Sequence, residues 1–239
     1  MFYTKKYKKT ESMVAMRKLT IISFVLLFSF SLLTACRTGQ PTPIQEDRQT
    51  TTPEDVQNTT PLDEYEKGTF TETEYESKYL DLRFELPDGF LMATEDDIRE
   101  MTGLGAEIMD LDSNVVEYAK LTTVHEMMAS SVDGGVNVIV LSEKLRMRNM
   151  TVAQYFDSLK SQLKNIPDME YEFDDEIVTI EIAGHKYEQM TLSTFVYGMD
   201  LVQKYIVRKI DNRIVGFVTT SKPGTEDILN TLMEGFSKY

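Results

Sequence analysis

The stretch LVQKYIVRKIDNRIVGFVTT, residues 201–220, decides the fold of this chain. Its two halves are rich in Val, Ile, Tyr, Phe and Thr, which favour β-strands. Between them, Asp211-Asn212-Arg213 supplies the polar residues typical of a tight turn. The stretch therefore predicts two antiparallel strands joined by a short turn.

Strand patterns continue on the N-terminal side of this hairpin. The segment HKYEQMTLSTFVYG (185–198) is predicted to pair with residues 201–210, and EIVTIEIAG (176–184) is a strand that ends at a glycine. Further upstream, AKLTTVHEMMASSVDGGVNVIVLSEKL (119–145) predicts another hairpin, with its turn at Asp133-Gly134-Gly135.

Two further predictions depend on the alternation of side chains along a strand. In SKYLDLRFELPDGF (77–90), apolar and charged residues alternate from Leu80 to Leu86, which predicts a half-buried strand that ends at Pro87-Asp88-Gly89. In the 119–145 hairpin, Met127 and Met128 are adjacent, so one is expected to face the core and the other solvent.

Three segments combine a threonine cap with the 3.6-residue period of an amphipathic helix. Thr94 precedes Glu95-Asp96-Asp97, Thr151 precedes VAQYFDSLKSQLKNI, and Thr225 precedes EDILNTLMEGFSKY. The residues expected on the buried faces are Ile98 and Met101; Val152, Tyr155, Phe156, Leu159, Leu163 and Ile166; and Ile228, Leu229, Leu232, Met233 and Phe236. With hairpins dominating, we predict an α+β fold: a mostly antiparallel β-sheet flanked by helices, as an α/β/α sandwich.

The N-terminal region has the layout of an export signal. Residues 1–18 hold six Lys or Arg and one Glu, and the uncharged stretch LTIISFVLLFSFSLLTA follows from Leu19 to Ala35. A membrane-spanning helix is the competing interpretation, but it needs about 20 predominantly apolar residues, and this stretch is slightly short. Met13 and Met16 are alternative starts to Met1, because MRKLTIISF already forms a complete signal opening.

The only cysteine of the chain, Cys36, directly follows that apolar stretch. Leu33-Thr34-Ala35-Cys36 resembles the lipobox of bacterial lipoproteins, in which small residues precede a cysteine that receives a diacylglycerol. The resemblance implies cleavage before Cys36 and lipidation of its thiol, with palmitate among the acyl chains. We therefore expect residues 1–35 to be a lipoprotein signal peptide and Cys36 to attach the chain to membrane lipid on the extracytoplasmic face of the cell membrane.

Composition divides the remainder into a tether and a domain. Residues 36–74 hold four prolines and many Thr, Gln and acidic residues with few large apolar ones, which predicts a disordered tether. Residues 75–239 are long enough for one domain with its own core. Without residues 1–35, 19 basic and 38 acidic side chains remain. This charge makes a nucleic-acid partner unfavourable and repels anionic lipid, so the anchor is expected to hold the protein at the membrane.

No set of residues predicts catalysis, a cofactor or a metal. The two histidines, His125 and His185, lie in separate segments, and a zinc site would need both. Asp110, Asp112 and Asn114 begin like a calcium loop, but Val115 and Leu121 occupy the positions of its glycine and its final glutamate, so an acidic loop is expected. The carboxylates of EFDDE (172–176) could attract calcium weakly. The P-loop, dinucleotide-binding and serine-nucleophile motifs are absent from the sequence.

The phrase YLDLRFELPDGF resembles the start of PsbP-like domains. The later phrases NVIVLSEKL, MTVAQYFDSLKSQL and QKYIVRKIDNRIVGFVTT resemble uncharacterised lipoproteins of Gram-positive gut bacteria with that fold. Known relatives are a photosystem assembly subunit and a Ran-binding protein. The resemblance implies a non-catalytic module that binds another protein or an envelope ligand. The alternative is an envelope hydrolase or metal-dependent enzyme whose carboxylates converge only in three dimensions.

Overall fold

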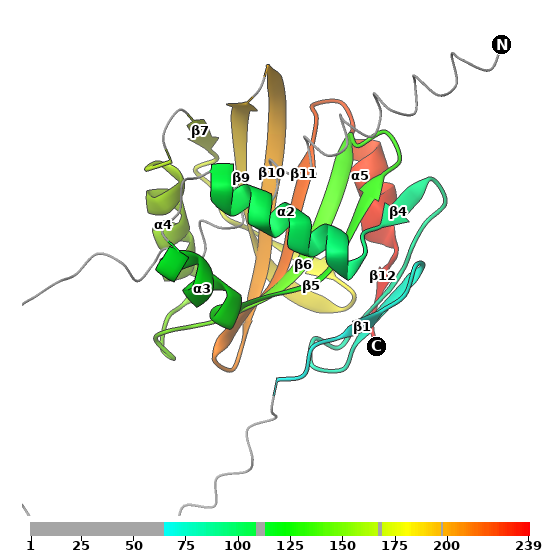
Figure 1. Ribbon diagram of the computed structural model, residues 1–239, viewed down its shortest axis with the longest axis horizontal. Helices are drawn as coiled ribbons and strands as arrows, with labels where there is room; N and C mark the ends of the chain where they lie inside the picture. The colour runs from blue at the N-terminus through cyan, green and yellow to red at the C-terminus, as the bar shows by residue number, and fades with distance from the viewer. Residues whose placement is uncertain (1–64, 109–112, 167–168, 197) are drawn as a thin grey trace, which may run out of the picture.

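The 201–220 hairpin lies inside the larger of two sheets in the computed structural model, which describes residues 65–108, 113–166, 169–196 and 198–239 (Figure 1). Strand β10 (Met199–Ile210) pairs with β11 (Arg213–Ser221) from Val202↔Ser221 to Ile210↔Arg213. Asp211 turns the chain in the left-handed region, at φ 49°. Asp tolerates this conformation better than most residues do.

The large sheet has eight strands, and every pairing in it is antiparallel. Its order is β4-β5-β6-β11-β10-β9-β7, with β8 also paired to β9. The remaining strands are β4 (Phe90–Met92), β5 (Thr123–Ser131), β6 (Val136–Lys144), β7 (Glu170–Phe173), β8 (Val178–Ile182) and β9 (His185–Val196). The predicted hairpin at 185–210 is therefore confirmed. The hairpin predicted at 119–145 is confirmed from Thr123 to Lys144, whereas residues 119–122 are the end of a helix, α3 (Ser113–Thr122).

A smaller sheet, β1-β2-β3-β12, is assembled from both ends of the described chain. Its strands are β1 (Thr69–Phe70), β2 (Glu74–Ser77), β3 (Leu82–Glu85) and β12 (Phe236–Ser237). Residues 65–74, assigned to the tether from composition, are thus part of the fold: Thr69 and Phe70 pair with Glu76 and Tyr75.

Four helices complete the described part of the chain: α2 (Glu95–Ile108), α3 (Ser113–Thr122), α4 (Val152–Leu163) and α5 (Glu226–Glu234). Thr151 caps α4 as predicted, and it forms a capping box with Gln154. Thr94 Oγ1 accepts a hydrogen bond from the Asp97 amide at 3.2 Å, which caps α2. Helix α3 was not predicted: residues 113–118 were expected to be an acidic loop.

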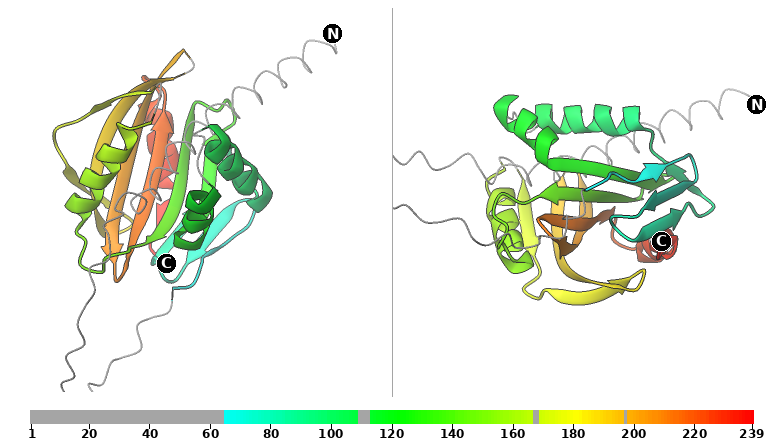
Figure 2. Two further views of the ribbon diagram at one scale, coloured as in Figure 1. Left: turned by 60° about the vertical axis from the view of Figure 1, so that its left-hand side comes forward. Right: turned by 90° about the horizontal axis from the view of Figure 1, so that it is seen from below.

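Each face of the large sheet is covered by a layer. Helices α2 and α4 cover one face, where Ile98, Tyr155 and Phe156 pack on Met128, Ile139 and Leu141. The small sheet and α5 cover the other face, where Tyr75, Phe84 and Leu232 pack on Met127, Val138 and Phe217. Figure 2 shows α2 on one side of the large sheet and α5 on the other. The fold is α+β and mostly antiparallel, as predicted, but one outer layer is a sheet with a helix.

This layering corrects two predictions about burial. Met127 is 0% exposed and Met128 2%, because alternation sends them to opposite faces and both faces are covered. In α5, Leu229 and Leu232 are buried as expected, whereas Ile228 is exposed. Phe236 is buried through strand β12, which pairs with β3 after the helix has ended.

Candidate functional site

The predicted lipidation site, Cys36, lies outside the described residues, as do the signal segment and most of the tether. None of the helices in the described ranges is long and apolar enough to cross a membrane.

The two histidines do not form a common site. His125 lies on β5, and burial lowers its pKa to about 4, an effect to which the nearby Lys67 adds. His185 begins β9, where its side chain is 19% exposed and its Nε2 lies 3.1 Å from Asp81 Oδ2. Lys238 Nζ lies 3.4 Å from the same oxygen, so this group ties the small sheet to the β8–β9 hairpin.

The acidic segments do not build a metal site within the described residues. No group of three or more His, Cys, Asp or Glu side chains there could hold an ion. Asp110 and Asp112 lie outside the described residues. The segment that begins at Ser113 is helical, and nothing is described of the Asn114 side chain. In EFDDE, Glu172 belongs to β7 and the next three acidic residues are exposed.

A buried carboxylate, Glu126, organises the attachment of the N-terminal segment. It is 0% exposed and accepts hydrogen bonds from Tyr65 Oη at 2.6 Å, the Gly68 amide at 2.8 Å and Tyr75 Oη at 3.1 Å. We name Tyr65, Gly68, Tyr75 and Glu126 the N-terminal clasp. Hydrogen bonds to an ionised acceptor are stronger than neutral ones, so one carboxylate holds three points of the eleven-residue segment 65–75.

A β-bulge presents Glu126 to this segment. The register of β5 on β6 shifts between His125↔Leu141 and Met127↔Val140, which leaves Glu126 as the extra residue. Met127 packs beneath the small sheet, and Glu126 reaches Tyr75 on the same side. The bulge therefore places a charged side chain where the chain enters the fold.

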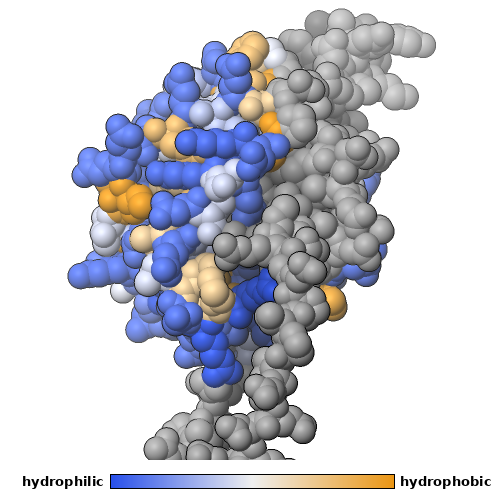
Figure 3. All heavy atoms as spheres, turned by 90° about the vertical axis from the view of Figure 1, so that its left-hand side faces the viewer, coloured by the Kyte–Doolittle hydropathy of each residue, from blue (hydrophilic) through white to orange (hydrophobic). Residues whose placement is uncertain are grey.

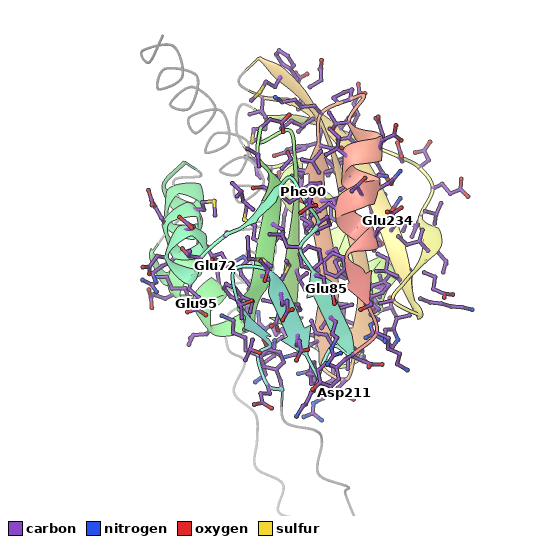
Figure 4. The ribbon with its side chains drawn as sticks, turned by 90° about the vertical axis from the view of Figure 1, so that its right-hand side faces the viewer. Glu72, Glu85, Phe90, Glu95, Asp211 and Glu234 are labelled. Atoms are coloured by element: carbon purple, nitrogen blue, oxygen red, sulfur yellow. The ribbon has the colours of Figure 1, made fainter. Side chains whose placement is uncertain are left out.

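Cations and rings extend the clasp. The guanidinium of Arg213 lies 3.6 Å from the centroid of the Tyr65 ring and donates to Ser142 Oγ at 2.8 Å. Tyr79 meets Tyr65 edge to face at 5.1 Å between centroids. Lys67 Nζ lies 2.9 Å from Glu95 Oε1 and so links the segment to the start of α2. Figure 4 labels Glu95 at that helix and Glu85 on β3. Burial, with the Glu126 charge second, raises the pKa of Tyr65 well above its usual value.

A second buried acidic side chain lies on the opposite face of the large sheet. Glu143 on β6 is 5% exposed and accepts a hydrogen bond from Tyr155 Oη of α4 at 2.9 Å. Burial raises the pKa of Glu143 to about 8, although the Tyr155 bond and Arg213 act in the other direction. This pair fixes α4 on the sheet.

A buried polar group lies on the same face, farther along the strands. Gln203 Nε2 donates to Thr220 Oγ1 at 2.9 Å, and Tyr205 Oη donates to Gln203 Oε1 at 3.2 Å. All three residues are fully buried, so these contacts satisfy polar groups inside the core.

Sequence reasoning missed the clasp. Sequence patterns give Glu126 no role, and composition places Tyr65 and Gly68 in the predicted tether. The one local signal is a glutamate within the apolar run TVHEMMAS. An acidic residue there needs a partner, but neither its partner nor the bulge can be derived from nearby residues.

No family model matches the chain, and no curated protein matches it. Solved structures match in fold. The solution structure of cyanobacterial PsbP (CyanoP) from Synechocystis covers 75% of this chain and 100% of that chain, at 11% identity and a TM-score of 0.42.

The crystal structure of LpqN, involved in cell envelope biogenesis of Mycobacterium tuberculosis, covers 65% of this chain and 82% of that chain, at 14% identity and a TM-score of 0.36. Both similarities concern the fold alone. The similarity to a PsbP protein, over 75% of this chain, is in the fold that the sequence phrases suggested.

Proposed function

We propose that this chain is an exported lipoprotein, held on the extracytoplasmic face of the cell membrane through an acylated Cys36. Its domain acts as a non-catalytic module that binds or assembles with another protein or an envelope ligand. The observation that carries the proposal is the clasp, which fixes on the domain the segment that leads back to Cys36.

The clasp suits an anchored module because it defines where the tether leaves the domain. Tyr65 is the first described residue, and 28 residues separate it from Cys36. A flexible chain of this length has a typical end-to-end distance of about 30 Å. The domain is therefore expected to stay near the bilayer with one end toward it.

The buried ionisable groups favour binding over catalysis because their contacts hold the fold together. Glu126 holds the N-terminal segment, Glu143 holds α4, and Asp81 joins His185 and Lys238 across two sheets. A catalytic carboxylate needs an approach for substrate. Glu126 and Glu143 are almost inaccessible to solvent.

Metabolic labelling tests the anchor. Cells fed a clickable palmitate should label the parent protein and not the Cys36→Ser variant, and the mature parent should lack residues 1–35. Equal labelling of both proteins, or retention of residues 1–35, would refute the lipid anchor.

Crosslinking in the native membrane tests the binding role. We expect a defined partner to be recovered with the parent protein. If nothing specific is recovered while the purified protein turns over an envelope substrate, the enzyme alternative replaces this proposal.

A further inference from the structure

We infer that the clasp end of the domain docks on an anionic lipid surface through residues 144–150, the last residue of β6 and the segment that follows it toward α4, here called the β6–α4 connection. The inference rests on the proposed function for its location, but it adds a surface and a ligand class. By the clasp end we mean the end that holds Tyr65, the β6–α4 connection and the β10–β11 turn.

Contacts place these segments together. The Leu145 amide donates to the Asn212 carbonyl at 2.8 Å, and Lys209 Nζ donates to the carbonyls of Arg148 and Met150. Arg213 contacts Tyr65, so the turn also meets the start of the described chain. Figure 1 shows the connection, the turn and the start of the described chain at the same end of the sheet, at the bottom of the view.

The connection is basic in an otherwise acidic protein. Lys144, Arg146 and Arg148 are exposed, and the sequence has no acidic residue from 144 to 156. The preceding acid, Glu143, is buried against Tyr155. Glu66 and Asp211 are exposed acids of this end, so the cations are concentrated in the connection rather than spread over the whole end.

Two large apolar side chains are exposed beside these cations. Met147 is 54% exposed and lies between Arg146 and Arg148. Leu121 is 79% exposed at the end of α3, two residues before β5, whose Thr123 pairs with Glu143. Its neighbour Lys120 is paired with Glu117 at 2.9 Å, so the free cations beside Leu121 are those of the connection. Apolar side chains flanked by Lys or Arg are typical of surfaces that insert at the headgroup boundary of a bilayer.

The opposite end of the domain carries the reverse charge. Its turns and the first turn of α5 expose Asp88, Asp133, Glu226 and Asp227, with Lys222 as a nearby cation. Contacts join these turns: the Val132 amide donates to the Gly89 carbonyl, and the Lys222 amide donates to the Gly135 carbonyl.

The side of the domain around α4 and β7 is a different surface. Figure 3 shows that it is mostly hydrophilic, with scattered apolar residues.

Separation of the two ends decides which charges a membrane would meet. The nine residues of β6 span about 27 Å, at about 3.4 Å per residue. Charges are screened over about 8 Å at physiological ionic strength. A bilayer at the clasp end would therefore meet the local cations, although the chain without residues 1–35 has 19 basic and 38 acidic side chains, a net charge of −19.

The tether makes a weak docking contact effective. As a flexible chain the predicted tether has a typical end-to-end distance of about 30 Å, so we expect it to keep the domain at a high effective concentration beside its own bilayer. Each Lys or Arg near an anionic surface strengthens attraction about fivefold, so three exposed cations supply about 100-fold.

A spin label at the clasp end tests the inference. The full protein, purified from cells, is reconstituted into vesicles of phosphatidylcholine alone or with about one-third phosphatidylglycerol. Acylated Cys36 cannot react, so Met147→Cys provides a single thiol for a nitroxide. Val132→Cys, 51% exposed at the opposite end, is the matched control. Relaxation by oxygen and by a water-soluble nickel chelate reports whether each label lies in lipid or in water.

We expect the label at 147 to lie in lipid only in the anionic vesicles, and the label at 132 to lie in water in both. Arg146→Gln with Arg148→Gln should lower the ratio of docked to undocked label about 25-fold, since two cations are removed. Lys222→Gln should leave the ratio unchanged. Circular dichroism melting should be the same for all variants, because these side chains are at the surface.

Equal water exposure of both labels in anionic vesicles would overturn the inference, as would docking that the double Arg variant leaves unchanged. Insertion of the label at 132 would show that the opposite end faces lipid. If Cys36 of the parent protein takes up the label, its thiol is free. That result would refute the acyl anchor but would not test docking. Docking would then be measured in the Cys36→Ser background, in which the label at 147 still distinguishes lipid from water.

Discussion

The strongest prediction concerns the buried carboxylate of the clasp. Glu126→Gln preserves shape but removes the charge and replaces one acceptor oxygen with a donor group. The carboxylate accepts three hydrogen bonds in the parent, from Tyr65, Gly68 and Tyr75. Two of these share Oε2, so an amide nitrogen at either position opposes at least one donor.

The structure sets the size of the effect. Each hydrogen bond to a charged group contributes about 1.5–3 kcal/mol, and a buried donor left without an acceptor costs a further 1–3 kcal/mol. Water can reach Tyr65 and Gly68, which are only partly buried, once the segment detaches. Tyr75 is fully buried and has no such access. We therefore expect Glu126→Gln to lower the free energy of unfolding by about 3 kcal/mol, and Tyr65→Phe by about 1.5 kcal/mol.

Urea unfolding measures these losses, and hydrogen exchange locates them. Protection of amides 65–70 should fall more than protection of β10 and β11. Gly68→Ala should release the same segment without touching the charge, because its Cβ would lie 2.6 Å from Tyr75 Cε2 and 2.7 Å from the Glu76 carbonyl oxygen. Glu85→Gln, an exposed residue of β3, is the control and should stay within about 0.5 kcal/mol of the parent. A Glu126→Gln protein as stable as that control, with unchanged protection, would refute the role of the clasp.

Two other predictions concern the core. Burial raises the pKa of Glu143 to about 8, so the folded protein keeps a proton that the unfolded chain releases above about pH 4.5. Between these two pH values the free energy of unfolding should therefore fall by about 1.4 kcal/mol for each unit by which the pH rises. Glu143→Gln should abolish that fall in urea titrations at successive pH values, and an unchanged pH profile would contradict the assignment. Gly216→Ala should destabilise by more than about 3 kcal/mol, because its Cβ would lie 2.0 Å from the Ile206 carbonyl oxygen. Gly103→Ala, in α2, should raise the free energy of unfolding by about 0.5–1 kcal/mol, because a Cβ there would have open space around it. Equal melting temperatures for the Gly216→Ala and Gly103→Ala proteins would contradict the close packing at Gly216.

Local chemistry determined much of the secondary structure from sequence alone. The hairpins at 119–145 and 185–221 follow from β-branched runs and short polar or glycine turns, whose conformations depend on a few adjacent residues. Helix α4 follows from its period and its threonine cap. The α+β class follows from the number of hairpins. The interpretation of Cys36 also belongs to the sequence, and it stays a prediction.

Only the tertiary structure decided which faces are covered and where the chain enters the fold. Alternation shows that Met127 and Met128 point in opposite directions, but it carries no information on a second layer that covers the other side. That layer contains β1 and β12, strands of two residues each, from opposite ends of the described chain. Strands this short have no period to detect, so distant partners define them. The clasp has the same cause: a bulge in β5 turns Glu126 toward a segment some 50 to 60 residues earlier, and no local pattern encodes that contact.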